Sequence, residues 1–303
     1  MKIARLFAAD VSLEDTPNIV PIESATGEVG ATFIARLAQE LKGEYQRDPA
    51  NVGLMDDFSV LKGRWCDPAK VHPLIREFYE HTTRFSVAVR PRWHWLFLPL
   101  FWLFRMIFAE LVGQFNLPVD DAEAGRGLDS HIDCIDIDHD KAPDIRGWVR
   151  TYKGTDIVVY VGVYTTITLD DGPYVSVGFP LPDANLTATL VPMNRREHDF
   201  LLKSSKWGSK YAGDYIASID ESRSPRRISA FRMRFLREEI EVYVRDGELL
   251  TDHRFYFLGC KFLTLMYTLT RKMTAPAVHN FGAMMTNAPN VRSAATAMLA
   301  RRP

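Results

Sequence analysis

The chain of 303 residues can bury a substantial core, and its 47% hydrophobic and 25% charged residues are typical of a globular protein. Its 37 Lys and Arg balance 38 Asp and Glu, so no overall field favours an acidic substrate, and we expect no nucleic-acid partner. Cys66, Cys134 and Cys260 stand far apart without metal-ligand spacing, which favours a reducing, cytoplasmic location and argues against a disulfide framework.

Helical spacing is the main pattern in residues 1–127. Apolar residues recur three and four apart over residues 31–45, which predicts an amphipathic helix. Asp67 followed by proline is typical of a helix start, and this second helix is expected to run to residue 84. A third helix is expected over residues 100–114. The acidic residues that soon follow the N-terminal Lys2 indicate that no secretory signal is present.

Residues 93–108 form an unusually apolar segment. A membrane-spanning helix needs roughly 20 apolar residues, and this segment is shorter, contains Pro99 and is followed by Glu110. We therefore expect a buried helix, the wall of a pocket or a segment lying in a membrane interface. The pocket wall is the preferred interpretation, with Trp95 and Trp102 as ligand-binding residues.

From residue 128 the pattern changes to short β-like runs separated by turn residues. Strands are predicted over residues 132–137, 147–152, 157–169, 174–179, 186–191, 215–219, 228–236, 240–245, 249–258 and 262–269. Because no helices separate them, the fold class is predicted to be α+β, with N-terminal helices packed on an antiparallel β-barrel-like or strongly curved sheet. We expect one cooperative domain made of residues 1–127, a β body over residues 128–272 and a partly helical tail over residues 273–303.

The densest group of polar residues surrounds His131. On a strand His131 and Asp133 would share a face, and a carboxylate beside an imidazole can orient it and raise its basicity. The pair is therefore a candidate for proton transfer, and a metal site is an alternative. A third interpretation is an edge strand whose charges resist aggregation. We assign no metal to the chain.

A second candidate group lies on the helix predicted to end near residue 84. Glu80 and Arg84 are four residues apart and would pair on one helical face. If the helix covers a cavity instead, Tyr79 would contact the ligand, and Glu80 and Arg84 would act in proton transfer and anion binding.

A third candidate group lies on predicted neighbouring strands. Trp148 and Arg150 alternate on one face, and Tyr160 and Tyr164 flank a glycine on the next strand. Aromatic rings with hydroxyl groups and one arginine can line an apolar ligand pocket, and they can equally form an ordinary β core. We take Trp148, Arg150, Tyr160 and Tyr174 as ligand-binding candidates and Tyr164 as a catalytic candidate.

The common cofactor and catalytic motifs are absent. The sequence has no GxGxxG, GxxxxGK[ST], HExxH or GxSxG pattern. These absences lower the expectation of dinucleotide, nucleotide and zinc-protease chemistry, and we expect no cofactor.

Several stretches, FYEHTTRF, QFNLP, RGWVRTY, VSVGFPLP and VYVRDGELLTDHRFYFLG, together resemble a group of uncharacterised bacterial proteins. The resemblance covers residues 54–272. It implies one continuous unit across the helical and β parts, and it implies no activity, cofactor or site residue.

The leading expectation is that a hydrophobic small molecule, such as a lipid, an isoprenoid or a polyketide-like compound, binds in a barrel-type cavity. One alternative is a cofactor-independent cyclase, isomerase or hydrolase acting on such a ligand. Another is a peripheral protein of the inner membrane surface, because no Asp or Glu occurs from Arg254 onwards. Convergence of the candidate catalytic side chains on one cavity would favour the enzyme.

Overall fold

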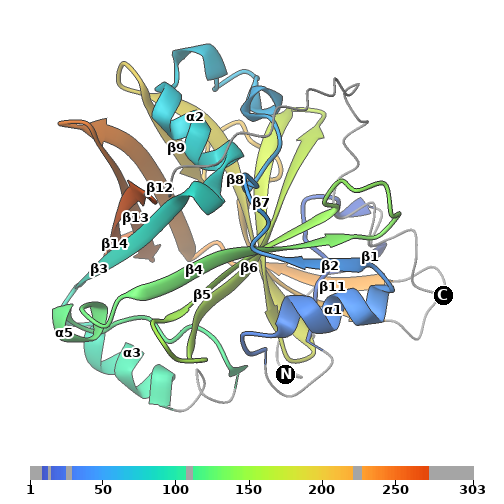
Figure 1. Ribbon diagram of the computed structural model, residues 1–303, viewed down its shortest axis with the longest axis horizontal. Coiled ribbons are helices and arrows are strands. Elements are labelled where there is room, and N and C mark those ends of the chain that lie inside the picture. The colour runs from blue at the N-terminus through green and yellow to red at the C-terminus, as the bar shows by residue number, and fades with distance from the viewer. Residues whose placement is uncertain (1–8, 13–14, 25–28, 107–111, 221–226, 273–303) are drawn as a thin grey trace, which may run out of the picture.

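The computed structural model describes residues 9–12, 15–24, 29–106, 112–220 and 227–272. About half of these residues belong to one 14-stranded antiparallel sheet, drawn in Figure 1. Its main path runs through β2 (Glu44–Arg47), β4 (Leu128–Asp136), β5 (Ile145–Tyr152), β6 (Val158–Leu169), β7 (Gly172–Leu181), β8 (Ala184–Arg195), β9 (Asp199–Lys203), β12 (Leu236–Arg245), β13 (Glu248–Phe257), β14 (Cys260–Arg271) and β3 (Phe85–Trp93).

The long strand β8 joins two parts of the sheet. Its first half pairs with β10 (Gly213–Asp220), and its last residues, Val191 to Arg195, pair with β9. A branch continues from β10 to β11 (Arg227–Arg232) and β1 (Ala9–Ser12). The strand β8 is therefore hydrogen-bonded to strands of both parts of the sheet.

The sheet is not closed into a barrel, which corrects the barrel-like expectation. β3 approaches β4, but in the described chain the two strands are not paired. Instead, β2 pairs with Asp133 to Asp136 of β4 on the edge opposite β5. Because that stretch of β4 is already hydrogen-bonded, β3 cannot complete a ring there.

The helices among the described residues are shorter than expected. They are α1 (Phe33–Leu41), α2 (Pro73–Glu80), α3 (Leu98–Phe104) and α5 (Asp121–Ala124), with 3-10 turns η3 (Phe58–Leu61), η4 (Pro68–Lys70) and η5 (Thr82–Arg84). The expected tail helix over residues 273–303 lies outside the described residues. No described helix is long and apolar enough to cross a membrane.

The second expected helix is replaced by two shorter ones, because the chain has two separate helix N-caps, Asp67 and His72. Asp67 accepts a hydrogen bond from Ala69 N–H, but only η4 follows. His72 then caps α2, which ends at Glu80. The strand β3, which sequence analysis missed, follows η5 and shows buried residues alternating with exposed ones.

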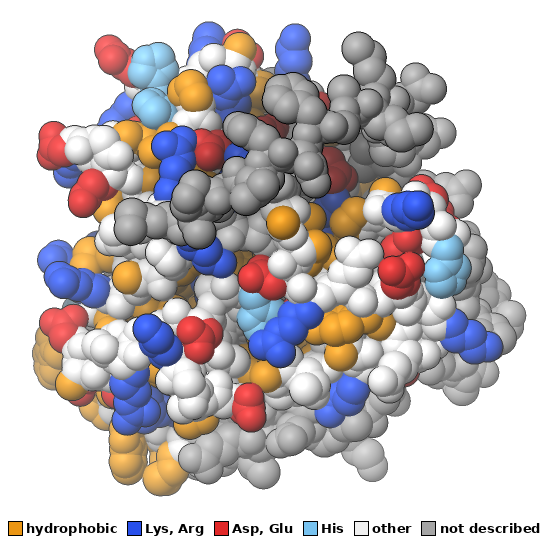
Figure 2. Space-filling model, viewed as in Figure 1, with side chains coloured by type: hydrophobic (Ala, Val, Ile, Leu, Met, Phe, Trp, Pro, Cys, Tyr) orange, Lys and Arg blue, Asp and Glu red, His pale blue; other side chains and the backbone are white. Residues whose placement is uncertain are grey.

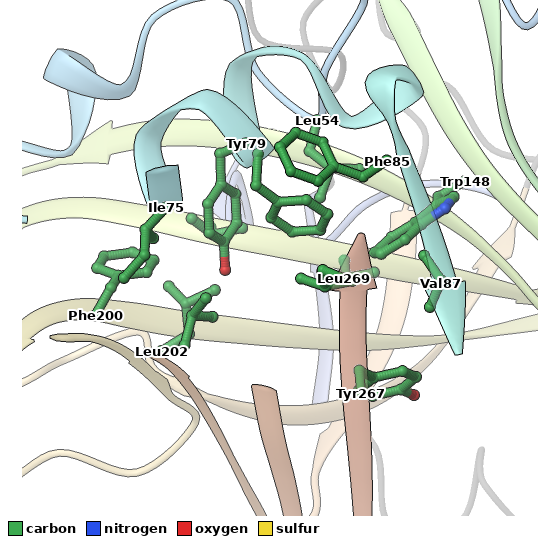
Figure 3. Close-up of a cluster of buried hydrophobic side chains, with 14 of the residues drawn as sticks. Leu54, Ile75, Tyr79, Phe85, Val87, Trp148, Phe200, Leu202, Tyr267 and Leu269 are labelled. Carbon is green, nitrogen blue, oxygen red and sulfur yellow. The ribbon is translucent and has the colours of Figure 1, made fainter. Parts of the chain in front are cut away.

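Two hydrophobic clusters cover the two faces of the sheet. The larger cluster fills the concave face and includes Tyr79 of α2, Trp148 of β5 and Tyr267 of β14 (Figure 3). The smaller one lies between α1 and the other face of β4, β5 and β6. The described part of the first 127 residues thus supplies both α1 and the strand β3, which pairs with β14.

Close packing of α1 depends on the absence of a side chain at Gly147. A Cβ atom at this position would lie 2.3 Å from Ile34 Cδ1 and 2.5 Å from Ile34 Cγ1. We predict that Gly147→Ala lowers the free energy of unfolding by about 1–3 kcal/mol because the added methyl group overpacks this contact.

Urea unfolding of Gly147→Ala, Ile34→Ala and the double variant measures this contact. The double variant should be destabilised by less than the sum of the single changes, because Ile34→Ala removes the clashing atoms. Additive effects would show that the α1 contact does not depend on Gly147.

Candidate functional site

The interior of the curved sheet contains a small cavity beneath α2. Its volume is about 60 Å³. Apolar walls come from Leu54, Phe78, Val177, Leu190, Leu202 and Leu269, and the polar groups come from Arg150, Glu238, His253, Tyr160, Tyr164 and Tyr267. Polar side chains from β5, β6, β12, β13 and β14 therefore meet inside an apolar core.

Arg150 is held at this cavity by aromatic rings. Its guanidinium carbon lies 4.0 Å from the ring centre of Trp148, 4.8 Å from that of Tyr160 and 5.7 Å from that of Tyr267. The side chain also donates a long hydrogen bond of 3.5 Å to the Tyr267 hydroxyl. Each ring presents a negative face to the cation, so the rings replace part of the hydration that burial removes.

The charge of Arg150 is not neutralised by an ion pair with any described residue. The residue is only 5% exposed, and its Nε atom is buried without a hydrogen-bond partner. A buried charge without a counter-ion costs several kcal/mol, because the lost hydration is not replaced. An anion entering the cavity would recover that free energy.

Glu238 and His253 form a hydrogen-bonded pair on the same cavity. Glu238 Oε2 lies 2.7 Å from His253 Nε2, and both side chains come from adjacent strands. Burial raises the pKa of Glu238 to about 8. Burial and the positive charge of Arg150 lower the pKa of His253 to about 3. The pair is therefore neutral at intermediate pH, with Glu238 as donor and His253 as acceptor.

A second buried carboxyl group extends this network. The Ser204 hydroxyl donates to Asp214 Oδ2 at 2.8 Å and accepts from the backbone N–H of Glu238 at 2.9 Å. Burial, and then the proximity of Glu238, raises the pKa of Asp214 well above its ordinary value. The network thus adds acidic protons near the cavity, and it does not supply Arg150 with a counter-ion.

The tyrosine hydroxyl groups at the cavity remain protonated. Burial raises the pKa of Tyr164 to about 12, against the opposing effect of Arg150. Burial likewise raises the pKa values of Tyr160 and Tyr267. These side chains can therefore donate hydrogen bonds to an anion bound beside Arg150.

Five of the residues singled out from the sequence line this cavity: Tyr79, Trp148, Arg150, Tyr160 and Tyr164. Tyr79 projects from α2 towards the concave face of the sheet (Figure 3). The aromatic strand faces therefore form an interior that contains both core packing and a small cavity.

The remaining ligand-binding candidates lie elsewhere. Tyr174 belongs to a separate core cluster, and its hydroxyl donates to Asp171 Oδ2 at 2.6 Å. Trp95 and Trp102 are 74% and 54% exposed. Trp102 lines a separate, open cleft of about 670 Å³ together with Arg105 and Met106.

That cleft is a weaker candidate for an anion site than the interior cavity. Arg105 is already neutralised by Glu123, with N–O distances of 2.6 and 2.8 Å. Its other cation, Arg126, lies over the ring of Tyr152 at 5.6 Å. The larger hollow thus lacks a buried unpaired charge among its described residues.

His131 and Asp133 share a face of β4, as alternation predicts, with Nε2 and Oδ1 3.5 Å apart. This face lies towards α1, because the residues that follow in alternation belong to the cluster under that helix. The Tyr45 hydroxyl donates to Asp133 Oδ2 at 3.0 Å. The pair is therefore separated from the cavity by the sheet itself.

Glu80 and Arg84 do not pair with each other as the longer helix would require. Glu80 Oε1 accepts from Phe58 N–H at 2.7 Å and so caps η3. Arg84 is exposed, donates to Asn51 Oδ1 at 2.8 Å and lies 3.8 Å from Glu77. Because α2 ends at Glu80, Arg84 leaves the helical face.

An acidic cluster near the β4–β5 turn has a structural explanation. Asp136, Asp138 and Asp144 bring carboxylate oxygens within 4.8 Å of one another. Asp136 accepts from the backbone N–H groups of His139 and Lys141, and Asp144 accepts from that of Ile137. These carboxylates hold the turn, and we assign no ligand to them.

Sequence reasoning missed Glu238 and His253. The signal was present in β12, where Glu238 alternates with Ile240 and Val242, so an acid occupies an inward position of an otherwise apolar face. His253 similarly lies between Thr251 and Phe255. A polar residue at an inward position of a predicted strand could have identified both.

The comparisons with known proteins give a relative and no activity. No family model and no solved structure match the chain. The uncharacterized membrane protein YndJ of Bacillus subtilis strain 168 is 26% identical over 243 residues, which are 80% of this chain and 41% of that protein. The chain therefore spans about two fifths of the relative's length. The resemblance to uncharacterised bacterial proteins is confirmed.

The opposed pKa shifts of Glu238 and His253 predict a stability maximum. Below pH 4.5 the unfolded state binds more protons than the native pair, so stability falls as the pH drops towards 3. Above pH 6.5 the native Glu238 holds a proton that the unfolded state has lost, so stability falls as the pH rises towards 8. Between these limits the pair contributes no slope.

Urea unfolding at pH 3 to 9 measures both limbs of the curve. Glu238→Gln should remove the alkaline slope that comes from about one bound proton, so the slope of the unfolding free energy against pH should fall by up to about 1.4 kcal/mol per pH unit. Glu239→Gln on the same strand is the matched control, because Glu239 pairs with Lys203 and not with His253. An unchanged alkaline limb in Glu238→Gln would contradict the raised pKa.

Proposed function

We propose that the protein binds a small molecule that has an anionic group and an apolar remainder. The observation that carries the proposal is Arg150, a buried guanidinium with an unpartnered Nε atom beside a cavity. A carboxylate fits this cation best, because its oxygens can accept from the guanidinium fork. The hydroxyl groups of Tyr164 and Tyr267 would complete its hydrogen bonding.

The size of the cavity limits the ligand. A volume of about 60 Å³ corresponds to a few water molecules, whereas pockets for drug-sized ligands are on the order of 300 Å³ or more. A whole lipid, isoprenoid or polyketide does not fit between the side chains as they stand. The proposed ligand is therefore a short-chain or small cyclic acid, whose apolar part would contact Leu54, Phe78 and Leu202.

A second candidate function is a cofactor-independent enzyme acting on such an acid. It is favoured by the Glu238–His253 pair, which provides a proton donor and a proton acceptor 2.7 Å apart on the cavity that contains Arg150. It is not favoured by the groups first considered, because His131, Asp133, Glu80 and Arg84 lie away from this cavity and only Tyr164 lines it. Recovery of a bound acid chemically unchanged would support binding alone.

We further propose that the protein works in a reducing compartment at the inner membrane surface. Cys66, Cys134 and Cys260 are free thiols, which suits the cytoplasm. The relative from Bacillus subtilis is named a membrane protein. Both observations support this location.

The ligand proposal predicts selective binding of small apolar carboxylates. Isothermal titration with straight-chain carboxylates from acetate to octanoate should show the tightest binding for chains of about three to six carbons, given the cavity volume. The corresponding amides should bind at least roughly tenfold more weakly, because they lack the charge that Arg150 would neutralise.

Arg150→Met should abolish carboxylate binding while leaving the melting temperature unchanged or raised, because the change removes an unpaired buried charge. Arg237→Met is the matched control, since Arg237 also lies over a tyrosine ring, 5.4 Å from that of Tyr256, but does not line the cavity. Equal binding of amides and carboxylates, or binding retained in Arg150→Met, would refute the proposal.

A further inference from the structure

The apolar segment identified in the sequence projects from the body of the protein. None of the residues of α3 is buried. Trp95, Leu96, Leu100 and Leu103 are 74%, 59%, 64% and 44% exposed. Figure 2 shows hydrophobic side chains gathered at the lower left edge of the molecule, where Figure 1 places α3. Such a concentration of exposed apolar side chains is typical of an interaction surface.

An inner layer of aromatic rings holds this segment in place. Trp93 stacks on Phe101 with ring centres 4.1 Å apart, and Phe97 packs on Phe262 at 5.6 Å. The backbone N–H of His94 donates to the carbonyl of Phe262 at 2.8 Å. The segment is therefore fixed to the first residues of β14, and its outer side chains remain exposed.

The turn between β13 and β14 extends the same surface. Phe257 and Leu258 are 39% and 72% exposed, and Phe257 lies 6.4 Å from Phe97. Phe235, which is 39% exposed, packs on Phe257 at 5.6 Å. We define the docking surface by six exposed residues: Trp95, Leu96, Leu100, Leu103, Phe257 and Leu258.

The charges beside the docking surface are mainly positive. Arg92, Arg234 and Lys261 are exposed and directly precede Trp93, Phe235 and Phe262, respectively. None of these cations forms an ion pair within the described part of the chain. The first turn of α5, which contacts β3, carries acidic residues that include Asp121. The cations thus form a rim that can attract an anionic surface.

We propose that the docking surface binds the face of an anionic phospholipid bilayer. Tryptophan and leucine side chains would enter the boundary between headgroups and acyl chains, and Arg92, Arg234 and Lys261 would contact lipid phosphates. A projecting apolar surface with a cationic rim matches a bilayer in shape and in charge. The inference rests on the membrane-side location proposed above and is independent of ligand binding in the cavity.

Vesicle flotation tests the inference. The full chain should float with vesicles that contain phosphatidylglycerol in phosphatidylcholine, and much less with pure phosphatidylcholine. Leu100→Glu combined with Leu103→Glu should reduce the bound fraction at least roughly tenfold, because it replaces inserted apolar groups by charges. Lys261→Gln should weaken binding roughly fivefold, and only on anionic vesicles.

Trp207→Glu is the matched control, because Trp207 is 92% exposed and lies outside the docking surface. It should bind vesicles like the unmodified protein, and so should Arg150→Met. If the unmodified protein ignores both kinds of vesicle, the proposed location and the docking surface both fail. If the unmodified protein and the double variant float equally, only the surface fails. If the double variant instead converts a dimer to a monomer, the surface contacts a second copy and the proposal is overturned.

Discussion

The concave interior of a curved, unclosed sheet has to be filled, and this requirement determines where most of the other features lie. Helix α2 supplies Phe78 and Tyr79 from one side, and the strands supply Trp148, Phe200 and Tyr267 from the other. These large aromatic side chains do not fill the curved interior completely, and the space left between them is the cavity. Arg150 lies on two of these rings, so the side chains that fill the interior also form the candidate site.

The electrostatics of the site follow from this burial. Water is largely excluded, so Glu238 keeps its proton and His253 stays neutral. Protonation of Glu238 removes the negative charge that could have neutralised Arg150. An ordinary core would pair these two residues as ions or replace both by apolar side chains. The observed arrangement leaves one positive charge available, and it is this property that suits an acidic ligand.

Sequence patterns predicted local features better than distant contacts. Alternation placed Trp148 with Arg150 and Tyr160 with Tyr164, and these residues line one cavity. The alternation of buried and exposed residues in β3 was also visible in the sequence. It was nevertheless assigned to the helical residues 1–127, because the pairing of β3 with β14 depends on residues far along the chain. Of the two predicted forms, barrel-like or strongly curved, the barrel-like form was wrong, and the sequence shows no sign of β2 at the edge of β4 because β2 has no apolar alternation. Glu238 was missed although it alternates with the inward-facing Ile240 and Val242.

The pairing of β3 with β14 has a consequence for how the chain folds during synthesis. Phe85 is opposite Arg271, so the two ends of this ladder are separated by most of the described chain. At roughly 5–20 residues per second, a ribosome needs on the order of ten seconds or more to make the intervening segment. Throughout that time the hydrogen-bonding edge and the apolar face of β3 lack their partner. The nascent chain is therefore most vulnerable to aggregation before β14 emerges, and this interval is where a chaperone would contribute most.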